Sequence, residues 1–272
     1  MPYRATIRLD VIRELIAMWE YIKICLIVCP LIFLGSFVDS VAGGGGIITL
    51  PAYMLAGLSP HTALGTNKMV SVCGSVTSSI KYIQTGHVVI RIAVLASIGS
   101  LAGGALGTSL TMLIPESTLQ IIMMVVLPVV AVFLSLNKSF TEKSRPRNFN
   151  KTTECSVALA IGLLIGCYDG LIGPGTGTFL IICFSSILGL DLLVSGGCAK
   201  VSNLASNLAS AVVAVIHGKV MYSIFLPAAL CSILGGWLGS RFAIKGGSKR
   251  IKKVMFLVLA LLFVKMIYDY FF

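Results

Sequence analysis

Long apolar blocks follow one another along this chain, with short polar stretches between them. Several of these blocks approach the ~20 residues that a helix needs to cross the hydrocarbon core of a bilayer. The clearest ones cover residues 24–38, 92–113, 119–136, 156–171 and 254–272. Blocks of this length predict membrane-spanning helices, so we expect an all-α, polytopic membrane protein with a multi-pass location in the plasma membrane.

The composition supports this prediction. Of the 272 residues, 57% are hydrophobic and 11% are charged, and the mean hydropathy is +0.97. A soluble domain has about 45–50% apolar and ~25% charged residues. This chain has too few charged residues to cover a surface exposed to water. The composition therefore excludes a soluble enzyme, a secreted disulfide scaffold and a disordered protein.

Glycines and charged residues recur along the chain in the same order. The first copy holds Asp39, Gly43, Gly45, Gly65, Lys68, Ser78, Gly86, Val88, Gly103, Gly104 and Gly107, and the second holds Asp169, Gly173, Gly175, Gly197, Lys200, Ser210, Gly218, Val220, Gly235, Gly236 and Gly239. The offset between the copies is constant as far as Gly45, and from Gly65 onward it is constant again but slightly longer, as a short insertion in the second copy would make it. Such a match predicts an internal duplication.

The recurrence divides the chain into two homologous transmembrane repeats at 22–137 and 155–272, with an N-terminal tail at 1–21 and a basic linker at 138–154. Each repeat is expected to hold an apolar segment, a glycine-rich interruption, a shorter apolar segment and three long spans. The expected segments are 22–38, 43–46, 47–57, 61–84, 88–110 and 117–136 in the first repeat, and 156–171, 173–177, 178–190, 195–216, 221–243 and 250–271 in the second.

Basic residues concentrate in two hydrophilic segments, 138–151 and 245–253. Basic segments between spans tend to stay on the cytoplasmic side of the membrane. If both do so, the chain between them crosses an even number of times, and its glycine-interrupted segment either enters and returns or crosses twice. The same reasoning in both halves predicts inverted repeats with both termini outside, although the basic residues of the N-terminal tail argue against this orientation. The net charge of +11 then reflects topology, and we expect no nucleic-acid partner.

The cysteines and histidines carry no sign of metal chemistry. The eight cysteines form no CxxC pair, and the three histidines show no ligand spacing to them. Small buried thiols are the ordinary explanation for such cysteines. We therefore expect no metal site and no cofactor.

Two glycine-rich motifs, GGGG at 43–46 and GPGTG at 173–177, interrupt segments that lie at membrane depth. Backbone that leaves the helix there needs partners in protein or in a water-filled cavity. The helix that restarts after each break presents free N–H groups and the positive end of its dipole, which favour an anion. The glycines predicted to bind substrate are Gly45, Gly46, Gly175 and Gly177. The alternative is close helix packing through small residues, which we prefer for the glycine clusters at 103–107 and 235–239.

Lys68 and Lys200 occupy matching places inside two long spans. An ammonium group near the bilayer centre costs about 2.5–3.5 kcal/mol on insertion scales. Each lysine begins a polar stripe whose spacing of three and four residues places it on one helical face. The stripes hold Lys68, Ser71, Ser75 and Ser78 in the first repeat and Lys200, Asn203, Asn207 and Ser210 in the second. We predict that both lysines bind substrate; the alternative is two lysines that extend toward a span end.

Further polar residues complete the predicted site. Thr66, Asn67, Asn203 and Asn207 are expected to donate hydrogen bonds to the substrate. Asp39 and Asp169 each stand just before a glycine break, where they either neutralise the two lysines or carry protons. Intramembrane carboxylates serve both purposes, so both interpretations stay open.

Three segments resemble the sulfite exporter TauE/SafE family of integral membrane proteins. They are DSVAGGGG at 39–46, LGTNK at 64–68 and DGLIGPGTG at 169–177, and the likeness covers residues 24–271. The resemblance implies export of sulfur-containing anions such as sulfite and organosulfonates. It does not imply which anion moves.

Together these features predict a secondary transporter that moves a small anion, a sulfur oxyanion or an organosulfonate, across the plasma membrane by alternating access. An anion channel is the nearest alternative, because a pore and a carrier share the same polar lining. A membrane enzyme is a further alternative, but the chain has no HExxH or GxSxG motif, and its histidines lie near predicted span ends. We expect no enzyme activity, and the sequence carries no signal for the oligomeric state.

Overall fold

The computed structural model describes residues 2–123, 125 and 150–271, which form helices and connections without a strand. Residues 116–123 are helical as well. The helices are α1 (Pro2–Ala42), α2 (Gly46–Leu55), α3 (Pro60–Gln84), α4 (Ile90–Leu113), α6 (Lys151–Leu171), α7 (Thr176–Ser186), α8 (Leu192–Ile216), the short 3-10 helix η1 (Tyr222–Ile224) and α9 (Phe225–Phe271). The all-α fold predicted from the apolar blocks is confirmed.

Five helical segments in the described part of the chain are long and apolar enough to cross a membrane. They are Tyr21–Ala42, Ile90–Leu113, Lys151–Leu171, Leu192–Ile216 and Tyr222–Ile251. Helix α3 is as long as α8 but falls outside this set, because asparagine, lysine, serine and threonine interrupt its apolar sequence. The structure is therefore that of a polytopic membrane protein with one long polar helix in its interior.

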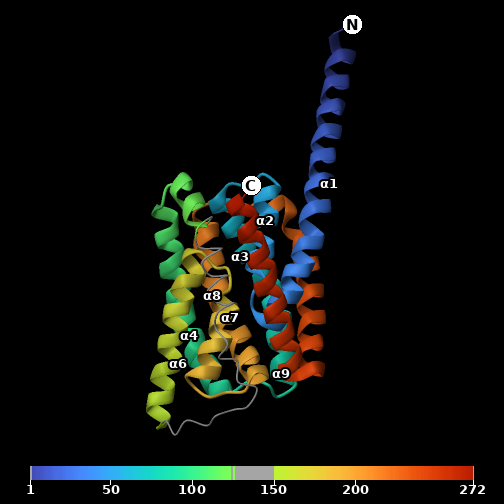
Figure 1. Ribbon diagram of the computed structural model, residues 1–272. Coiled ribbons are helices and arrows are strands. Elements are labelled where there is room, and N and C mark those ends of the chain that lie inside the picture. Colours follow the sequence, from blue (N-terminus) through green and yellow to red (C-terminus); the bar gives the residue numbers. More distant parts are fainter. Residues whose placement is uncertain (1, 124, 126–149, 272) are drawn as a thin grey trace.

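The two glycine-interrupted segments enter the bundle from opposite ends (Figure 1). Helix α1 descends from the end that holds the N-terminus and stops inside the bundle, and α2 returns to that same end. Helix α6 enters from the other end, and α7 returns there. Of the two alternatives left open by the charge pattern, the observed one is that each interrupted segment enters and returns. The two chain ends lie at the same end of the bundle (Figure 1).

Glycines bring α4 against α6 and α9 against α1. A Cβ atom added to Gly103 would lie 2.2 Å from the carbonyl oxygen of Leu163, and one added to Gly235 would lie 2.3 Å from that of Phe33. Gly235 is the counterpart of Gly103 in the recurrence, and Leu163 is the counterpart of Phe33. The close-packing role predicted for these glycines is thus confirmed. Two inverted copies would produce such paired contacts, and the internal repeat stays a prediction that they support.

The two short helices are buried in the core. Phe184 of α7 belongs to the largest cluster of buried apolar side chains, together with Ile92 and Leu192. Tyr53 of α2 packs in a second cluster with Val28. Burial of this apolar surface holds both short helices in place, and with them the glycine breaks at which they begin.

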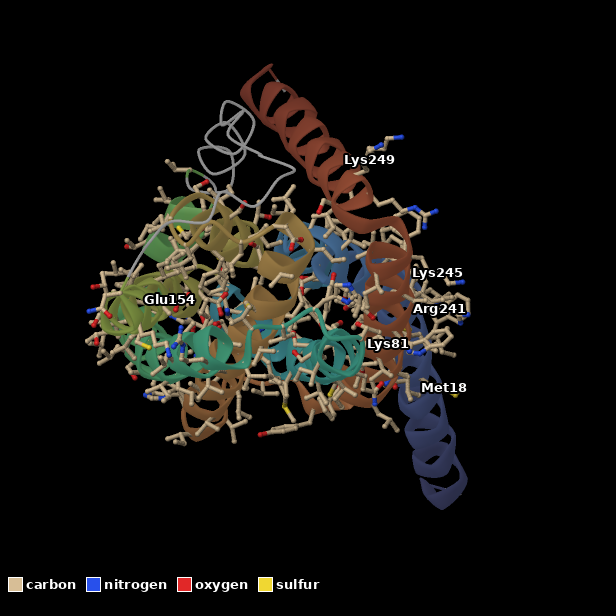
Figure 2. The ribbon with its side chains drawn as sticks, turned by 90° about the horizontal axis from the view of Figure 1, so that it is seen from below. Met18, Lys81, Glu154, Arg241, Lys245 and Lys249 are labelled. Atoms are coloured by element: carbon tan, nitrogen blue, oxygen red, sulfur yellow. The ribbon has the colours of Figure 1, made fainter. Side chains whose placement is uncertain are left out.

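Two segments have a helical structure that the sequence did not predict, although the first span begins at Tyr21, where the tail was expected to end. The tail expected at 1–21 is part of α1, which begins at Pro2; proline suits the first turn of a helix, and no glycine occurs before Gly35. The basic segment at 245–253 lies within α9 rather than in a loop, because only Gly247 leaves helical geometry there (φ 59°, ψ −162°). Arg241, Lys245 and Lys249 project from this part of α9 at the outer edge of the bundle (Figure 2).

Part of the predicted organisation lies outside the described residues. This applies to most of the third span of the first repeat, expected at 117–136, and to most of the basic linker at 138–154. The second repeat is described through its last span, which follows the kink at Gly247.

Candidate functional site

The two glycine breaks meet in the middle of the bundle. A Cβ atom added to Gly43 would lie 2.2 Å from the carbonyl carbon of Gly177, and Gly43 has a φ of +80°, which side chains rarely adopt. Thr178 donates a hydrogen bond from Oγ1 to the carbonyl oxygen of Ala42, at 2.7 Å, which satisfies the broken end of α1. Glycine is required at Gly43 both by the backbone conformation and by the contact between the two breaks.

A small cavity lies at this crossing. Every residue that lines it is glycine or carries a polar side chain, in a chain that is 57% hydrophobic. The lining residues are Gly35, Ser36, Asp39, Ser40, Gly43, Gly45, Gly46, Thr49, Asn67, Lys68, Ser71, Gly74, Ser75, Asp169, Gly173, Thr176, Gly177, Asn203, Asn207 and Ser232. A polar chamber inside an apolar bundle is the arrangement expected of a site for a hydrophilic solute.

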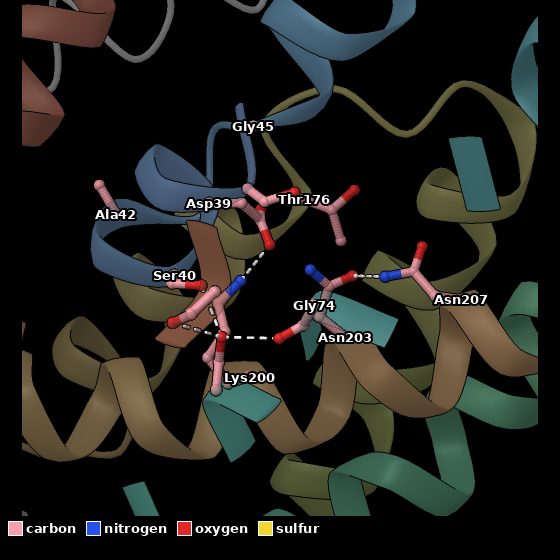
Figure 3. A network of polar contacts seen from close by, with 12 residues as sticks. Asp39, Ser40, Ala42, Gly45, Gly74, Thr176, Lys200, Asn203 and Asn207 are labelled. Atoms are coloured by element: carbon pink, nitrogen blue, oxygen red, sulfur yellow. Dashed lines mark hydrogen bonds and ion pairs between the residues drawn. The ribbon is translucent and has the colours of Figure 1, made fainter. Parts of the chain in front are cut away.

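Two buried ion pairs stand at the cavity, and each joins the two halves of the chain. Lys68 Nζ of α3 lies 2.6 Å from Asp169 Oδ1 of α6. Lys200 Nζ of α8 pairs with Asp39 Oδ2 of α1 (Figure 3). Both lysine side chains are almost fully buried, and a buried charge is tolerated only when it is paired. In this arrangement each carboxylate neutralises the lysine of the other half.

The two aspartates differ in their surroundings. Asp169 also accepts a hydrogen bond from Ser206 Oγ, at 2.6 Å on Oδ2, and its side chain is only 3% exposed. Asp39 has a side chain that is 21% exposed, and Lys200 is its one side-chain partner among the described residues. In the first copy, the residue that matches Ser206 is Gly74. Asp39 therefore has no hydroxyl at the matching position to donate a hydrogen bond to it. Asp39 is therefore the more exposed of the two carboxylates that line the cavity.

Neutral polar groups cover the rest of the chamber. Asn207 donates from Nδ2 to Asn203 Oδ1 at 3.0 Å, which orients the two amides side by side on α8 (Figure 3). The hydroxyl of Ser75, on the facing side of α3, is buried and has no hydrogen-bond partner among the described residues. A buried hydroxyl without a partner costs stability, and this one lines the cavity.

A model of the sulfite exporter TauE/SafE family matches residues 28–266 of this chain. The chain belongs to that family. Similar proteins include "Probable membrane transporter protein ORF9" of Sinorhizobium sp, 33% identical over 87% of this chain and 90% of its own length. Others are "Probable membrane transporter protein YfcA" of Escherichia coli K12, at 30% with 87% of both chains covered, and a "Probable membrane transporter protein" of Haemophilus influenzae, at 32% with 87% and 92% covered. No solved structure matches the chain significantly.

Membership in the TauE/SafE family fixes the general function. The protein is a membrane transporter, a multi-pass protein of the plasma membrane that acts on a small-molecule substrate. The resemblance noted from the motifs at 39–46, 64–68 and 169–177 is thereby confirmed as family membership.

The structure of this TauE/SafE transporter brings most of the predicted site residues together. Those that line the cavity are Lys68, Asn67, Asn203, Asn207, Gly45, Gly46, Gly177, Asp39 and Asp169. Lys200 is not part of the lining and meets the chamber only through Asp39. Thr66 does not reach it either, because its Oγ1 accepts a hydrogen bond from the backbone N–H of Met221 at 2.9 Å. Gly175 is not part of the lining either. It directly precedes α7 in a left-handed conformation, with φ 81°, which the turn before this helix requires.

Several polar residues in and around the chamber were not predicted. Thr176 lies inside the second glycine motif, where its Oγ1 donates to the carbonyl oxygen of Gly173 at 2.7 Å. Ser206, the partner of Asp169, follows Asn203 by three residues, so the helical spacing that identified the asparagines also points to it. Ser36 and Ser232 carry no signal of this kind, because nothing local shows that α1 and α9 bring them together, with their Oγ atoms 2.9 Å apart.

Proposed function

We propose that this TauE/SafE protein is a secondary transporter that moves a small anion, a sulfur oxyanion or an organosulfonate, by alternating access. The observation that carries the proposal is the polar chamber at the crossing of the two helix breaks, lined by the starts of two helices and by a lysine. The helix starts and the lysine supply positive charge, and the crossing of the breaks supplies a point about which the two halves can move.

The preference for an anion rests on the two short helices. Helix α2 begins at Gly46 and α7 begins at Thr176, and both residues line the chamber. The first N–H groups of a helix have no partner within the helix, and the helix dipole adds a partial positive charge at that end. In this protein Ile47, Ile48 and Thr176 already donate from their backbone N–H groups to the carbonyl oxygens of the glycine turns. Two such helix ends at one chamber still favour an oxyanion, through the dipoles and through the first-turn N–H groups that these turns leave unpaired.

Charge balance links the anion to a proton. The two lysines and two aspartates sum to zero charge, so an added anion leaves the chamber negative. Protonation of Asp39 cancels that charge and releases Lys200 to face the anion. The charged or titratable groups around Asp39 are Lys200 on α8, Asp169 on α6, and Lys68 and Tyr82 on α3, whose hydroxyl donates to the carbonyl oxygen of Ser40. We therefore assign the proton to Asp39 and a neutralising role to Asp169.

The arrangement of the helices supports the proposal of alternating access. The α1–α2 pair enters from one end and the α6–α7 pair from the other, and the two breaks touch at Gly43 and Gly177. In transporters built from inverted repeats, a site at the repeat interface opens to either side as one repeat moves against the other. The crossed ion pairs lie at that interface and would have to separate or shift during such a motion.

The two alternative functions, a channel and an enzyme, predict different properties. A channel conducts without saturating at low solute concentration and without a response to a pH gradient beyond that of the solute itself. An enzyme requires a reactive constellation, whereas the relatives of this chain are named as transporters. The described residues hold no group of three or more metal-ligating side chains. The transporter interpretation gives a role to the helix starts, the lysines and the aspartates, and it is the one we propose.

The test is binding followed by flux. The purified protein is heated with sulfite, sulfate, thiosulfate, sulfoacetate, taurine or acetate, and a ligand that binds the folded state raises the unfolding temperature. The solute with the largest shift is then followed into proteoliposomes, where we expect saturable uptake and exchange of internal for external solute. The double variant Lys200→Met/Asp39→Asn should lose both binding and uptake.

The matched control is an ion pair of the same kind outside the chamber. Arg91 of α4 pairs with Glu154 in the first turn of α6, and both side chains are partly exposed. Arg91→Gln/Glu154→Gln should bind and transport as the unmodified protein does. Equal loss in both double variants, or uptake that stays linear in solute concentration, contradicts the proposal.

A further inference from the structure

A second feature, separate from the chamber, is an outward-facing groove between α1 and α9. Its walls are apolar and include Phe37 of α1 and Leu238 and Phe242 of α9. Three cations, Arg241, Lys245 and Arg250, line one groove together with these apolar side chains. An apolar surface and a cluster of positive charges thus occur in one place on the membrane-facing side of the protein.

The groove is built by helix spacing and by glycine. Leu238, Arg241, Phe242 and Lys245 are separated by three, one and three residues, so they share one face of α9. Beside them, the close approach of α9 to α1 at its glycines lets Phe37 contact Phe242, with ring centroids 5.6 Å apart. The apolar wall is therefore continuous from one helix to the other.

The kink in α9 adds the third cation. Gly247 turns the chain, and Arg250 comes to lie over the ring of Phe242, with its guanidinium carbon 4.5 Å from the ring centroid. Arg241 lies in the same way over Trp237, at 5.3 Å. Such contacts orient a guanidinium group while leaving most of its N–H donors free for a ligand.

These cations are not neutralised by the protein. Within the described residues, every ion pair involves other lysines, arginines or histidines, and none joins Arg241, Lys245 or Arg250 to a carboxylate. All three side chains are exposed at the outer edge of the bundle, where Arg241 and Lys245 are visible in Figure 2. Basic side chains at a membrane surface attract anionic lipid headgroups.

The first half of the chain provides an internal comparison. Helix α4 packs on α6 through Gly103 and Gly107, as α9 packs on α1 through Gly235 and Gly239. At the positions that match Arg241, Lys245 and Arg250 in the recurrence, α4 and its continuation have Ser109, Leu113 and Thr118. Packing of this kind of helix pair therefore does not require cations. The cations at these positions of α9 are therefore free to serve another purpose, and they fit an anionic ligand at that end of the bundle.

We propose that this groove binds an anionic phospholipid. An acyl chain lies along Phe37, Leu238 and Phe242, and the phosphate group of the lipid accepts hydrogen bonds from Arg241, Lys245 and Arg250. The lipid is the ligand whose two parts, an apolar chain and an anionic head, match the two parts of the groove. Binding is expected at this end of the bundle and not at the matching helix pair of the first half.

The native tryptophans provide the reporter. The chain has two, and Trp19→Phe leaves Trp237 beside Arg241 as the single one. The variant is reconstituted into bilayers in which either the phosphatidylglycerol or the phosphatidylcholine carries bromine on its acyl chains, at equal mole fraction. Bromine quenches tryptophan fluorescence on contact, so we expect stronger quenching by the brominated phosphatidylglycerol. Each cation replaced by glutamine should weaken the relative affinity for this lipid about fivefold, and R241Q/K245Q/R250Q should abolish the preference.

Two controls make the result specific. Leu106→Trp in a Trp19→Phe/Trp237→Phe background reports on the matching surface of α4, where Leu106 is 58% exposed, and should be quenched equally by both lipids. Lys81→Gln removes a cation on α3 at the same end of the bundle and should leave the preference of Trp237 unchanged. Equal quenching of Trp237 by the two lipids, or a preference that survives in the triple variant, overturns the proposal. So does an equal loss of preference in Lys81→Gln, because that would mean a general effect of surface charge.

Discussion

The ammonium group of Lys68 lies 2.6 Å from the carboxylate of Asp169, and the two residues come from different halves of the chain. The second buried pair, Lys200 with Asp39, is crossed in the same sense. Neither half alone neutralises its own lysine. The two halves therefore depend on each other electrostatically as well as through packing, and variants that remove one partner of a pair test this dependence.

Lys68→Ala should destabilise the protein by about 3–5 kcal/mol, because it leaves the buried carboxylate of Asp169 without a counter-charge. Lys68→Met/Asp169→Asn removes both charges and should recover most of the lost stability. Unfolding of the purified proteins by denaturant in detergent measures the difference. If the single and double variants are equally unstable, the pair does not act as a neutralising unit.

Asp39→Asn and Asp169→Asn should affect transport differently. With asparagine at position 39 the proposed proton acceptor is lost, so solute exchange at equal pH continues while an imposed pH gradient no longer drives accumulation. Both variants should reduce stability, because each leaves a buried lysine without its counter-charge. Asp169→Asn should nevertheless keep the response to pH in the protein that remains folded. Proteoliposome uptake with and without a pH gradient, normalised to folded protein, separates the two. A gradient response that persists in Asp39→Asn places the proton elsewhere.

Ser206→Ala should cost about 1–3 kcal/mol of stability, because Oδ2 of Asp169 loses its hydrogen-bond donor in a buried site. Ser202, four residues earlier on α8, is a matched control, since its hydroxyl is buried without a hydrogen-bond partner among the described residues. Ser202→Ala should be close to neutral. Thermal unfolding of the two variants side by side gives the comparison, and equal effects would argue against a specific role for Ser206.

Gly43→Ala should prevent stable folding, because the new Cβ atom would meet the backbone of Gly177 at 2.2 Å and a φ of +80° disfavours any side chain. Gly57 has a similar φ, +86°, but nothing within 4 Å of an added Cβ atom. Gly57→Ala should therefore cost only the backbone term of about 1–2 kcal/mol. Yield of monodisperse protein and its unfolding temperature measure both, and a well-folded Gly43→Ala would show that the two breaks are not in contact.

The protein should lose some stability in acid through Glu116, which follows α4. The hydroxyl of Ser59, which donates to Glu116 at 2.9 Å, lowers the pKa of this carboxyl, and His61 and Lys219 nearby act in the same direction. A lowered pKa in the folded state means that the contribution is complete above the ordinary value of 4.5 and is lost as the pH falls through the lower folded value. Because Glu116 is half exposed, the effect is small.

Ser59→Ala is the variant that checks this pH dependence. It should raise the pKa of Glu116 toward its ordinary value and flatten the dependence of the unfolding temperature on pH in the acidic range. Thr85→Ala, at the end of α3 and without a carboxylate partner among the described residues, is the control. An unchanged acid profile in Ser59→Ala would show that the hydroxyl does not act on Glu116.

Much of the helical architecture follows from local sequence. The predicted spans at 61–84 and 195–216 correspond to α3 and α8, and the glycine motifs at 43–46 and 173–177 mark the places where the helices break. These features depend on hydropathy and on backbone freedom, which each short stretch of sequence carries in itself. The polar stripes also predicted which faces of α3 and α8 turn inward, since helical spacing alone places Lys68 and Asn203 on buried faces.

Which lysine pairs with which aspartate was decided only by the tertiary structure. The sequence alone identified Lys68, Lys200, Asp39 and Asp169 as groups that need compensation in an apolar bundle, but it left open which meets which. Packing of α3 on α8, with α1 and α6 entering from opposite ends, crossed the pairs and placed Lys200 behind Asp39. The same packing turned Thr66 toward Met221 and away from the chamber. Contacts between residues far apart in the chain depend on how whole helices pack, and no local pattern of hydrophobic and polar residues contains that information.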